Sequence, residues 1–198
     1  MVDYNFKPRI GADEYGWYGR GYLPHFDGPE RTQFLTFRLF DSMPAALLQR
    51  WQRESCSDIE FRKQVEKYLD AGYGSNWLRR SDVASLICNS LQFHHQTKYD
   101  LDSWVIMPNH VHVLLTPLAG FHLDQIEHSI KSYTAKEANK VLHRTGQFWA
   151  VECFDRYIRG RRHFNAVIRY IENNPVKARL CRRPEDWPFS SAALGWKK

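Results

Sequence analysis

The chain has 198 residues, with 28 Lys and Arg against 22 Asp and Glu and a net charge of +6 at pH 7. This length predicts one domain that buries a core without a disulfide or metal staple. Hydrophobic residues make up 43% and charged residues 25%, which excludes a disordered, collagen-like or coiled-coil chain. Aromatic residues reach 15%, and rings combined with positive charge are compatible with nucleic-acid binding without establishing it.

The chain shows no pattern for export or membrane insertion. No apolar segment follows Met1 as in a signal peptide, and no run of about 18 apolar residues is present. The cysteines form no C-x-x-C pair and are expected to be free thiols: Cys56, Cys88, Cys153 and Cys181. These features predict a cytoplasmic protein without a membrane partner.

The first half of the chain is predicted to hold an arm, a strand and helices. Residues 1–30, rich in Gly and Tyr, are typical of a loop and N-terminal arm. Thr, Phe and Leu predict a strand over 31–41. Helical spacing follows over 45–70 and again over 81–96, where Ser81 is the expected N-cap.

The second half predicts two strands, a long helix, a third strand and a last helix, in this order: 99–107, 109–117, 123–144, 148–158 and 162–174. Pro175 is expected to end the last helix, because proline lacks the N–H that a helix needs, and residues 176–198 form an irregular tail. This order predicts an α+β fold, a mainly antiparallel sheet covered by helices, in one domain over 31–198.

The segment MPNHVHVLLTP over 107–117 is the most informative stretch. Side chains two residues apart on a strand share a face, so His110 and His112 project together while Val111 and Val113 face helices on the other side. Two imidazoles at this spacing can hold one metal ion or phosphate. The alternative is a pair of unrelated histidines on a solvent-facing strand.

The last predicted helix carries two polar side chains beside its apolar stripe. The stripe follows helical spacing through Phe164, Val167, Ile168 and Ile171. Tyr170 and Asn174 lie one turn apart on its flank, together with His163, where a phenolic and an amide oxygen could reach one site. Taken alone, these residues are also typical of a surface tyrosine and a helix-ending asparagine.

Together the two stretches resemble the REP-associated tyrosine transposases, members of the HUH single-tyrosine transposase superfamily. REP denotes a repetitive extragenic palindrome, and HUH denotes His, a hydrophobic residue and His. The motifs that carry the resemblance are MPNHVHVLL, the Tyr-Ile-x-x-Asn-Pro-Val-Lys that follows it, and DWPFSS. The similarity runs from about residue 31 to about residue 192. It implies a ferredoxin-like or RRM-like antiparallel sheet with helices packed on it and the HUH motif on a strand.

The resemblance also implies the chemistry of the site. Tyr170 is the nucleophile, and His110, His112 and Asn174 bind a divalent metal, Mg²⁺ or Mn²⁺. The reaction cleaves and rejoins single-stranded DNA through a 5′-phosphotyrosine, and it needs no nucleotide cofactor. A tyrosine with a pKa near 10 is protonated at neutral pH, so it requires a nearby cation or base. A metal at the histidines would polarise the scissile phosphate.

Two other tyrosines are alternative nucleophiles. Tyr133 has Glu137 one turn away, but its place at the edge of an apolar stripe favours core packing. Tyr157 lies on the strand predicted at 148–158 and is the weaker rival.

By resemblance the partner is single-stranded DNA with a REP-type hairpin, bound by a monomer or homodimer associated with the nucleoid. Basic side chains near the motifs are the candidate phosphate contacts: Lys131, Arg156, Arg159, Arg161, Arg162, His163 and Lys177. Two other functions remain open, a non-catalytic hairpin-binding protein with the same fold and a metal-dependent hydrolase built on the His-x-His strand.

Overall fold

The computed structural model describes residues 16–19, 24–28 and 30–196. Its strands are β1 (Gly16–Gly19), β2 (Pro24–Asp27), β3 (Gln33–Arg38), β4 (Tyr99–Ile106), β5 (His110–Pro117) and β6 (Phe154–Tyr157). Its α-helices are α1 (Ala45–Glu54), α2 (Asp58–Asp70), α3 (Ser81–Phe93), α4 (Leu123–Val141) and α5 (Arg161–Lys177). Short 3₁₀ helices lie at Phe40–Ser42, Trp77–Arg79 and Pro184–Asp186.

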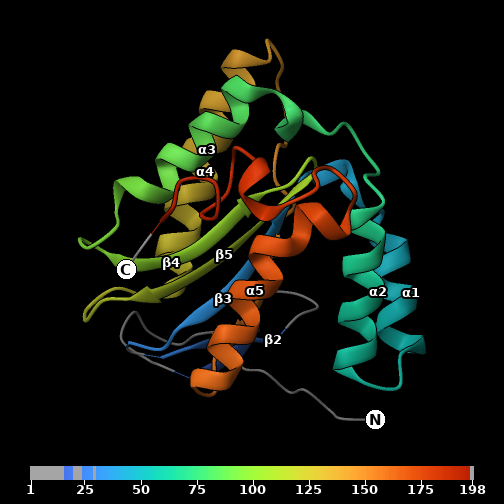
Figure 1. Cartoon of the computed structure of the whole chain (residues 1–198). Coiled ribbons are helices and arrows are strands. Elements are labelled where there is room, and N and C mark those ends of the chain that lie inside the picture. The colour runs from blue at the N-terminus through green and yellow to red at the C-terminus, as the bar shows by residue number, and fades with distance from the viewer. Residues whose placement is uncertain (1–15, 20–23, 29, 197–198) are drawn as a thin grey trace.

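Four of the strands form one antiparallel sheet in the order β4-β5-β3-β6. Counted along the chain, these are the second, third, first and fourth strands of the sheet, which is the ferredoxin-like order. Figure 1 shows α5 on one face of the sheet and α3 and α4 on the other, with α1 and α2 side by side at one end. The predicted α+β fold is therefore confirmed.

Alternation along the strands creates two different sheet faces. On β5, Val111, Val113 and Leu115 are fully buried and join the main core with residues of α3 and α4. The intervening residues His110, His112 and Leu114 face the opposite layer, where Leu114 packs with α5. The period of two that places valines in the core thus places both histidines beneath α5.

Helix α5 is fixed to the sheet by its apolar stripe. Val167 and Ile171 are buried and pack with Val105, Met107 and Leu114. Phe164 and Ile168 are half-buried at the margin of the same cluster. This packing sets the rotation of the helix and turns the flank with Tyr170 toward β5 and β3.

The free edge of β4 is covered by the C-terminal segment. The backbone N–H of Ile106 donates to the carbonyl of Phe189 at 2.9 Å, and that of Ser191 donates to the carbonyl of Trp104 at 2.9 Å. Trp187 Nε1 also donates to the carbonyl of Ile106 at 2.9 Å. The predicted irregular tail is therefore an ordered cover for an edge that would otherwise expose unpaired backbone groups.

The structure corrects three predicted boundaries. The helix predicted over 45–70 is two helices, because Ser57 caps a new one by accepting from the N–H of Glu60 at 3.2 Å. The strand predicted over 148–158 is reduced to β6, preceded by an isolated bridge between Leu39 and Trp149. Pro175 does not end α5, since it lies in the last turn, where proline costs one hydrogen bond and keeps a helical φ.

The N-terminal arm is not all loop. Gly16–Gly19 and Pro24–Asp27 pair as a two-stranded hairpin, and β2 lies against β6. The rest of the predicted arm, residues 1–15, 20–23 and 29, lies outside the described residues. Among the helices of the described part of the chain, none has the length and apolar character needed to cross a membrane.

Candidate active site

The two histidines of β5 lie together under α5. Their rings are 4.7 Å apart between centroids, and each side chain is about 1% exposed. Burial, and then the charge of Lys177, lower the pKa of His110 to about 3. Burial, and then His110 and Lys177, lower the pKa of His112 well below its usual value. Both imidazoles are therefore neutral, which leaves each with one lone pair.

Hydrogen bonds at Nδ1 fix where these lone pairs point. The Asn109 amide nitrogen donates to the carbonyls of Leu69 (3.2 Å) and Tyr73 (2.9 Å), so its oxygen faces His110 Nδ1 at 2.7 Å as an acceptor. His110 Nδ1 therefore carries the hydrogen, and Nε2 carries the lone pair. His112 Nδ1 lies 2.8 Å from the hydroxyl of Thr36 on β3.

Tyr170 of α5 reaches the second histidine. Its hydroxyl lies 3.4 Å from His112 Nε2, and its ring packs edge-on against Phe34 at 5.8 Å between centroids. Burial, and then Glu66 and Asp70, raise the pKa of Tyr170. The phenol is therefore protonated, and its hydroxyl lies within reach of both His112 Nε2 and the carboxylate of Glu66.

Asn174 lies one turn beyond Tyr170 and is completely buried. Among the described residues, neither its amide oxygen nor its amide nitrogen has a hydrogen-bond partner, and the same holds for His110 Nε2. Buried polar atoms in proteins are nearly always satisfied. Two neutral imidazoles and a buried amide oxygen are kinds of donor that Mn²⁺ and Mg²⁺ accept.

Two charged side chains lie next to Tyr170, Glu66 of α2 and Lys177 of α5. Glu66 approaches the Tyr170 hydroxyl, and burial raises the pKa of this carboxylate while Lys177 opposes the change. Lys177 lies 5.6 Å from the Tyr170 ring centre, and its Nζ is paired with Asp70 at 2.8 Å. The tyrosine thus lies between two neutral imidazoles and a carboxylate that can accept a proton.

The sequence does not indicate Thr36, Glu66 or the role of Asn109 in the site. Asn109 directly precedes His110, so a polar residue at this position is a sequence feature that could have indicated a hydrogen-bond partner for the histidine. Thr36 and Glu66 reach the site from distant segments, and nothing in their local sequence marks them.

The predicted DNA contacts fall into two groups. Four of them are exposed: Arg156 on β6, Arg159 in the loop that follows, and Arg161 and Arg162 at the start of α5. His163 is half-buried beside them. Lys177 also lies on this layer, next to Tyr170. Lys131 does not, because it belongs to α4 on the other face of the sheet, where its Nζ donates to Glu127 (3.0 Å) and to the carbonyl of Val151 (2.7 Å).

The rival tyrosines lie away from the histidines. Tyr133 is on α4, across the sheet, and is 53% exposed, so the prediction that it packs in the core is wrong. Its neighbour Glu137 is paired with Lys140 instead. Tyr157 of β6 packs at a tilt against Phe26, with 4.9 Å between ring centroids, and Arg159 lies over its ring.

A second buried polar group links the N-terminal hairpin to β6. His25 Nδ1 hydrogen-bonds the carboxylate of Asp155, and its Nε2 lies 3.6 Å from Glu152. Cys153 lies close enough for these side chains to be considered as metal ligands. The imidazole and carboxylate already face each other as an ion pair, however. Burial opposes protonation, but Asp155 and Glu152 outweigh it and raise the pKa of His25 to about 9.

The strand order and the motif on β5 define the class of the protein. The chain belongs to the IS200-like transposase family, because the model of that family, described as "Transposase IS200 like", matches residues 76–174, half of the chain. The matched segment contains both histidines of β5 as well as Tyr170 and Asn174.

Within this family the chain is similar to REP-associated tyrosine transposases. It is 25% identical over 95 residues to the REP-associated tyrosine transposase of Escherichia coli (strain K12). The alignment covers 47% of the chain and 54% of that protein, so the chain spans about half the length of this curated relative. A solved structure of a REP-associated tyrosine transposase bound to a REP hairpin has a TM-score of 0.52, with 19% identity, and covers 91% of this chain and 87% of that one. This likeness confirms the fold.

Proposed function

We propose that the chain is a metal-dependent single-stranded DNA endonuclease and strand transferase that acts on REP-type hairpins through a 5′-phosphotyrosine. The observation that carries the proposal is the position of the Tyr170 hydroxyl, 3.4 Å from His112 Nε2 and on the same helix as the buried, unpartnered amide of Asn174. A nucleophile beside a preformed set of metal donors is what cleavage of a phosphodiester by tyrosine requires.

The proposed metal ligands are His110, His112 and Asn174. A divalent ion bound there would polarise the scissile phosphate and stabilise the charge that develops on it. The ligand set is neutral, so the bound DNA phosphate would supply the negative charge that complements the cation. Asn109 holds His110 in the tautomer that offers Nε2, and Thr36 would do the same for His112 by accepting from its Nδ1–H.

The chain's own residues account for the proton and the leaving group. Tyr170 Oη forms a bond to phosphorus while the bond from phosphorus to the 3′-oxygen breaks. Glu66 is placed to accept the phenolic proton and to return it to the 3′-oxygen, which leaves as a free 3′-OH. One phosphodiester is exchanged for another, so rejoining needs no external energy source. Burial, and then Glu66 and Asp70, raise the pKa of Tyr170, so the phenol is protonated before the reaction and needs such a proton acceptor.

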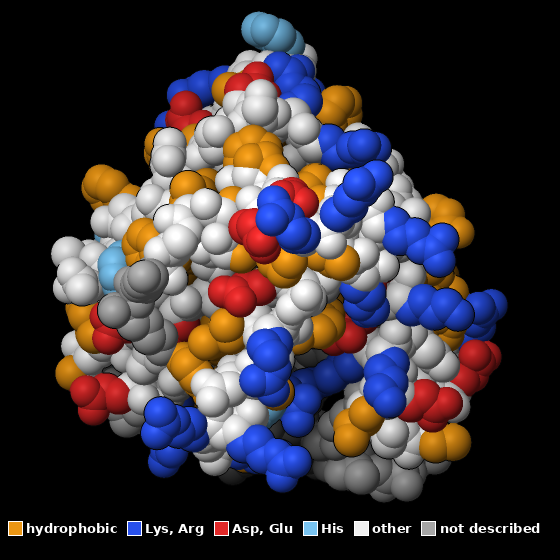
Figure 2. Space-filling model, in the orientation of Figure 1, with side chains coloured by type: hydrophobic (Ala, Val, Ile, Leu, Met, Phe, Trp, Pro, Cys, Tyr) orange, Lys and Arg blue, Asp and Glu red, His pale blue; other side chains and the backbone are white. Residues whose placement is uncertain are grey.

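Hairpin recognition is proposed from the relatives and from the charge on the α5 layer. The structural relative is bound to a REP hairpin. Lys and Arg side chains gather on the side of the molecule that carries α5 and α2, around a hollow between the two helices (Figure 2). Arg161 and Arg162 are exposed in the first turn of α5 and suited to backbone phosphates. Such an enzyme would act on DNA of the nucleoid, as a monomer or a homodimer.

A covalent-adduct assay tests this function. Full-length chain is incubated with labelled hairpin DNA that carries a single-stranded flank, in Mg²⁺ or Mn²⁺, and SDS-stable complexes are separated on a gel. The wild type should form an adduct and Tyr170→Phe should form none, because only the hydroxyl is removed. Tyr133→Phe is the matched control and should match the wild type, since that tyrosine lies across the sheet.

Two results would contradict the proposal. An adduct that survives Tyr170→Phe would assign the nucleophile to another residue. Hairpin binding by the wild type without any adduct, in either metal, would favour the non-catalytic hairpin-binding alternative.

A further inference from the structure

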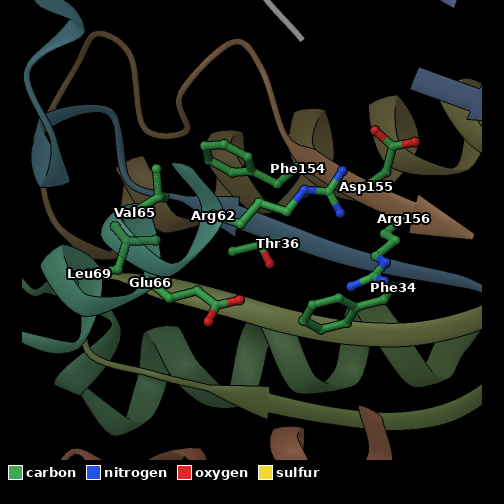
Figure 3. A pocket seen from close by; sticks show the side chains of 9 residues that line it. All are labelled: Phe34, Thr36, Arg62, Val65, Glu66, Leu69, Phe154, Asp155 and Arg156. Atoms are coloured by element: carbon green, nitrogen blue, oxygen red, sulfur yellow. The ribbon is translucent and has the colours of Figure 1, made fainter. Parts of the chain in front are cut away.

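Charged side chains from two helices meet at the candidate active site. On α5, Tyr170, Asn174 and Lys177 follow helical spacing and therefore share one side of the helix. On α2, Glu66 and Asp70 lie one turn apart and both approach this side of α5. Figure 3 shows Glu66 extending from α2 over the strands of the sheet. The proposed nucleophile is thus bordered by two carboxylates from α2 and by one ammonium from its own helix.

Lys177 is the cation that compensates the charge of Asp70. Its Nζ lies 2.8 Å from Asp70 Oδ2. The other carboxylate oxygen, Oδ1, is buried and accepts no hydrogen bond from the described residues. Only 12% of the Asp70 side chain is exposed, so water would screen this carboxylate poorly if the ammonium were removed. The ion pair therefore cancels a negative charge that the site would otherwise carry.

The charges of this pair extend to the reacting groups. Lys177 Nζ lies 5.6 Å from the centre of the Tyr170 ring. Burial, and then the carboxylates of Glu66 and Asp70, raise the pKa of Tyr170, so the charge of Asp70 acts on the phenol. Burial, and then Lys177, lower the pKa of His110, so the positive charge acts on a proposed metal ligand. A phosphate between the tyrosine and the histidines would therefore experience both charges.

The sign of these charges matters because the proposed substrate is an anion. The scissile phosphate is negatively charged and must come within bonding distance of the Tyr170 hydroxyl. Two uncompensated carboxylates on α2 would repel it. The pair of Asp70 and Lys177 has no net charge, so the only carboxylate of the two that remains uncompensated is Glu66, the proton acceptor of the proposed reaction.

We propose that Lys177 is a positioning residue that neutralises Asp70 and so allows the scissile phosphate to approach Tyr170, and that it is not one of the contacts that hold the DNA backbone. The inference rests on the proposed function and deepens it, because it explains how an acidic side of α2 can border a site for an anionic substrate. It departs from the sequence-based prediction, which places Lys177 among the phosphate contacts.

The covalent-adduct assay with the full-length chain at saturating hairpin DNA tests this role. Lys177→Gln should slow adduct formation about thirtyfold, because Asp70 is left as an uncompensated charge near the phosphate. Lys177→Arg keeps the charge, so its rate should stay within about threefold of the wild type. Lys140→Gln is the matched control, because Lys140 is also exposed and paired, with Glu137 at 2.8 Å, but belongs to α4 across the sheet. It should keep the wild-type rate.

A second substitution separates charge compensation from other roles. Asp70→Asn combined with Lys177→Gln removes both charges, so the double variant should recover to within about threefold of the wild-type rate. If Lys177 contacted a DNA phosphate, or only fastened α5 to α2, the double variant would stay at least as slow as Lys177→Gln. Asp70→Asn alone should remain close to the wild type, whereas a purely structural ion pair would be weakened equally from either side.

The same set of variants is compared for affinity on the Tyr170→Phe chain, which cannot form the adduct. Fluorescence anisotropy of the labelled hairpin in Mn²⁺ should show weaker binding for Lys177→Gln and restored binding when Asp70→Asn is added. Arg161→Gln is the comparison for a direct phosphate contact, because it removes one exposed positive charge at the opposite end of α5. Asp70→Asn should not restore its affinity.

The outcomes keep the two proposals apart. A double variant that stays as slow as Lys177→Gln, or that binds as weakly, would overturn the inference. If the wild type binds the hairpin but forms no adduct, the proposed function fails. The affinities then decide the inference by themselves: restored binding in the double variant supports it, and unrestored binding overturns it.

Discussion

Each histidine of the β5 pair has a polar neighbour at its Nδ1 atom, one from the residue before β5 and one from β3. Asn109 fixes His110, and Thr36 fixes His112. Such partners set the tautomer and the ring orientation, so they control whether Nε2 presents a lone pair. The sequence shows the pair of imidazoles, but their chemical state depends on these two hydrogen bonds.

Replacing Thr36 by valine should slow adduct formation about ten- to a hundredfold, the usual effect of losing a partner of a metal-bound histidine. Valine keeps the shape of threonine and removes the hydroxyl that His112 uses. The rate is measured in the covalent-adduct assay at saturating DNA. Thr32→Val removes a hydroxyl that bonds only Thr116 among the described residues, at 2.8 Å, and should keep the wild-type rate. Equal rates in both variants would show that Thr36 does not orient His112.

Glu66→Gln tests the assignment of the proton acceptor. Glutamine keeps the size of glutamate but cannot take the phenolic proton, so the adduct should form roughly a hundredfold more slowly, while affinity for hairpin DNA should not fall. Glu54→Gln is the control, because Glu54 is exposed on α1 and pairs with Arg50. An unchanged rate in Glu66→Gln would remove this residue from the reaction.

At the level of elements, α5 and β5 form the site because their packing faces are complementary. Val167 and Ile171 hold α5 on the sheet, and the helical repeat then turns Tyr170 and Asn174 to the histidines. Helix α2 adds Glu66 from the side. Strand β6, which leads into α5, is itself joined to the N-terminal hairpin through His25 and Asp155.

The link between β2 and β6 should make the stability of the fold depend on pH. The pKa of His25 is raised to about 9, so protonated His25 stabilises the fold fully below pH 6.5, its ordinary pKa. That contribution, roughly 3 kcal/mol, should be lost as pH rises through about 9. His25→Gln should lower the free energy of unfolding in urea at pH 6, and the gap to the wild type should close above pH 9.

The control for this measurement is His128→Gln, since His128 is exposed on α4. It should follow the wild-type curve at every pH. A gap between His25→Gln and the wild type that stays constant from pH 6 to pH 10 would show that His25 is not charged in the fold.

At the scale of the whole molecule, the helices on the two faces of the sheet have different roles. The layer of α3 and α4 holds the main core, including Leu35, Phe37 and Trp104. The layer of α5 and α2 holds the candidate site and most of the predicted DNA contacts. The C-terminal segment closes the β4 edge of the sheet between them. That residues 31–198 form one catalytic domain with residues 1–30 as an arm stays a prediction.

Removing residues 187–198 should expose the β4 edge and destabilise the chain by roughly 3 kcal/mol, because the indole bonds of Trp187 and Trp196 and the burial of their rings are lost together. Exposed edges pair with other chains, so light scattering should also detect self-association. A chain that ends at Trp196 is the control and should remain as stable as the full chain. A monomeric, equally stable truncated chain would contradict the proposed cover.

The sequence by itself determined the α+β class, the two histidines on one strand face, and the helical flank that joins Tyr170 to Asn174. These features depend on periods of 2 and 3.6 residues, which are local properties of the chain. It did not determine that Pro175 continues α5, that Tyr133 is exposed, or that Lys131 lies across the sheet. These outcomes depend on packing between distant segments. Only the tertiary structure brought Thr36 and Glu66 to the site, because strand pairing and the docking of α2 join residues that no local pattern connects.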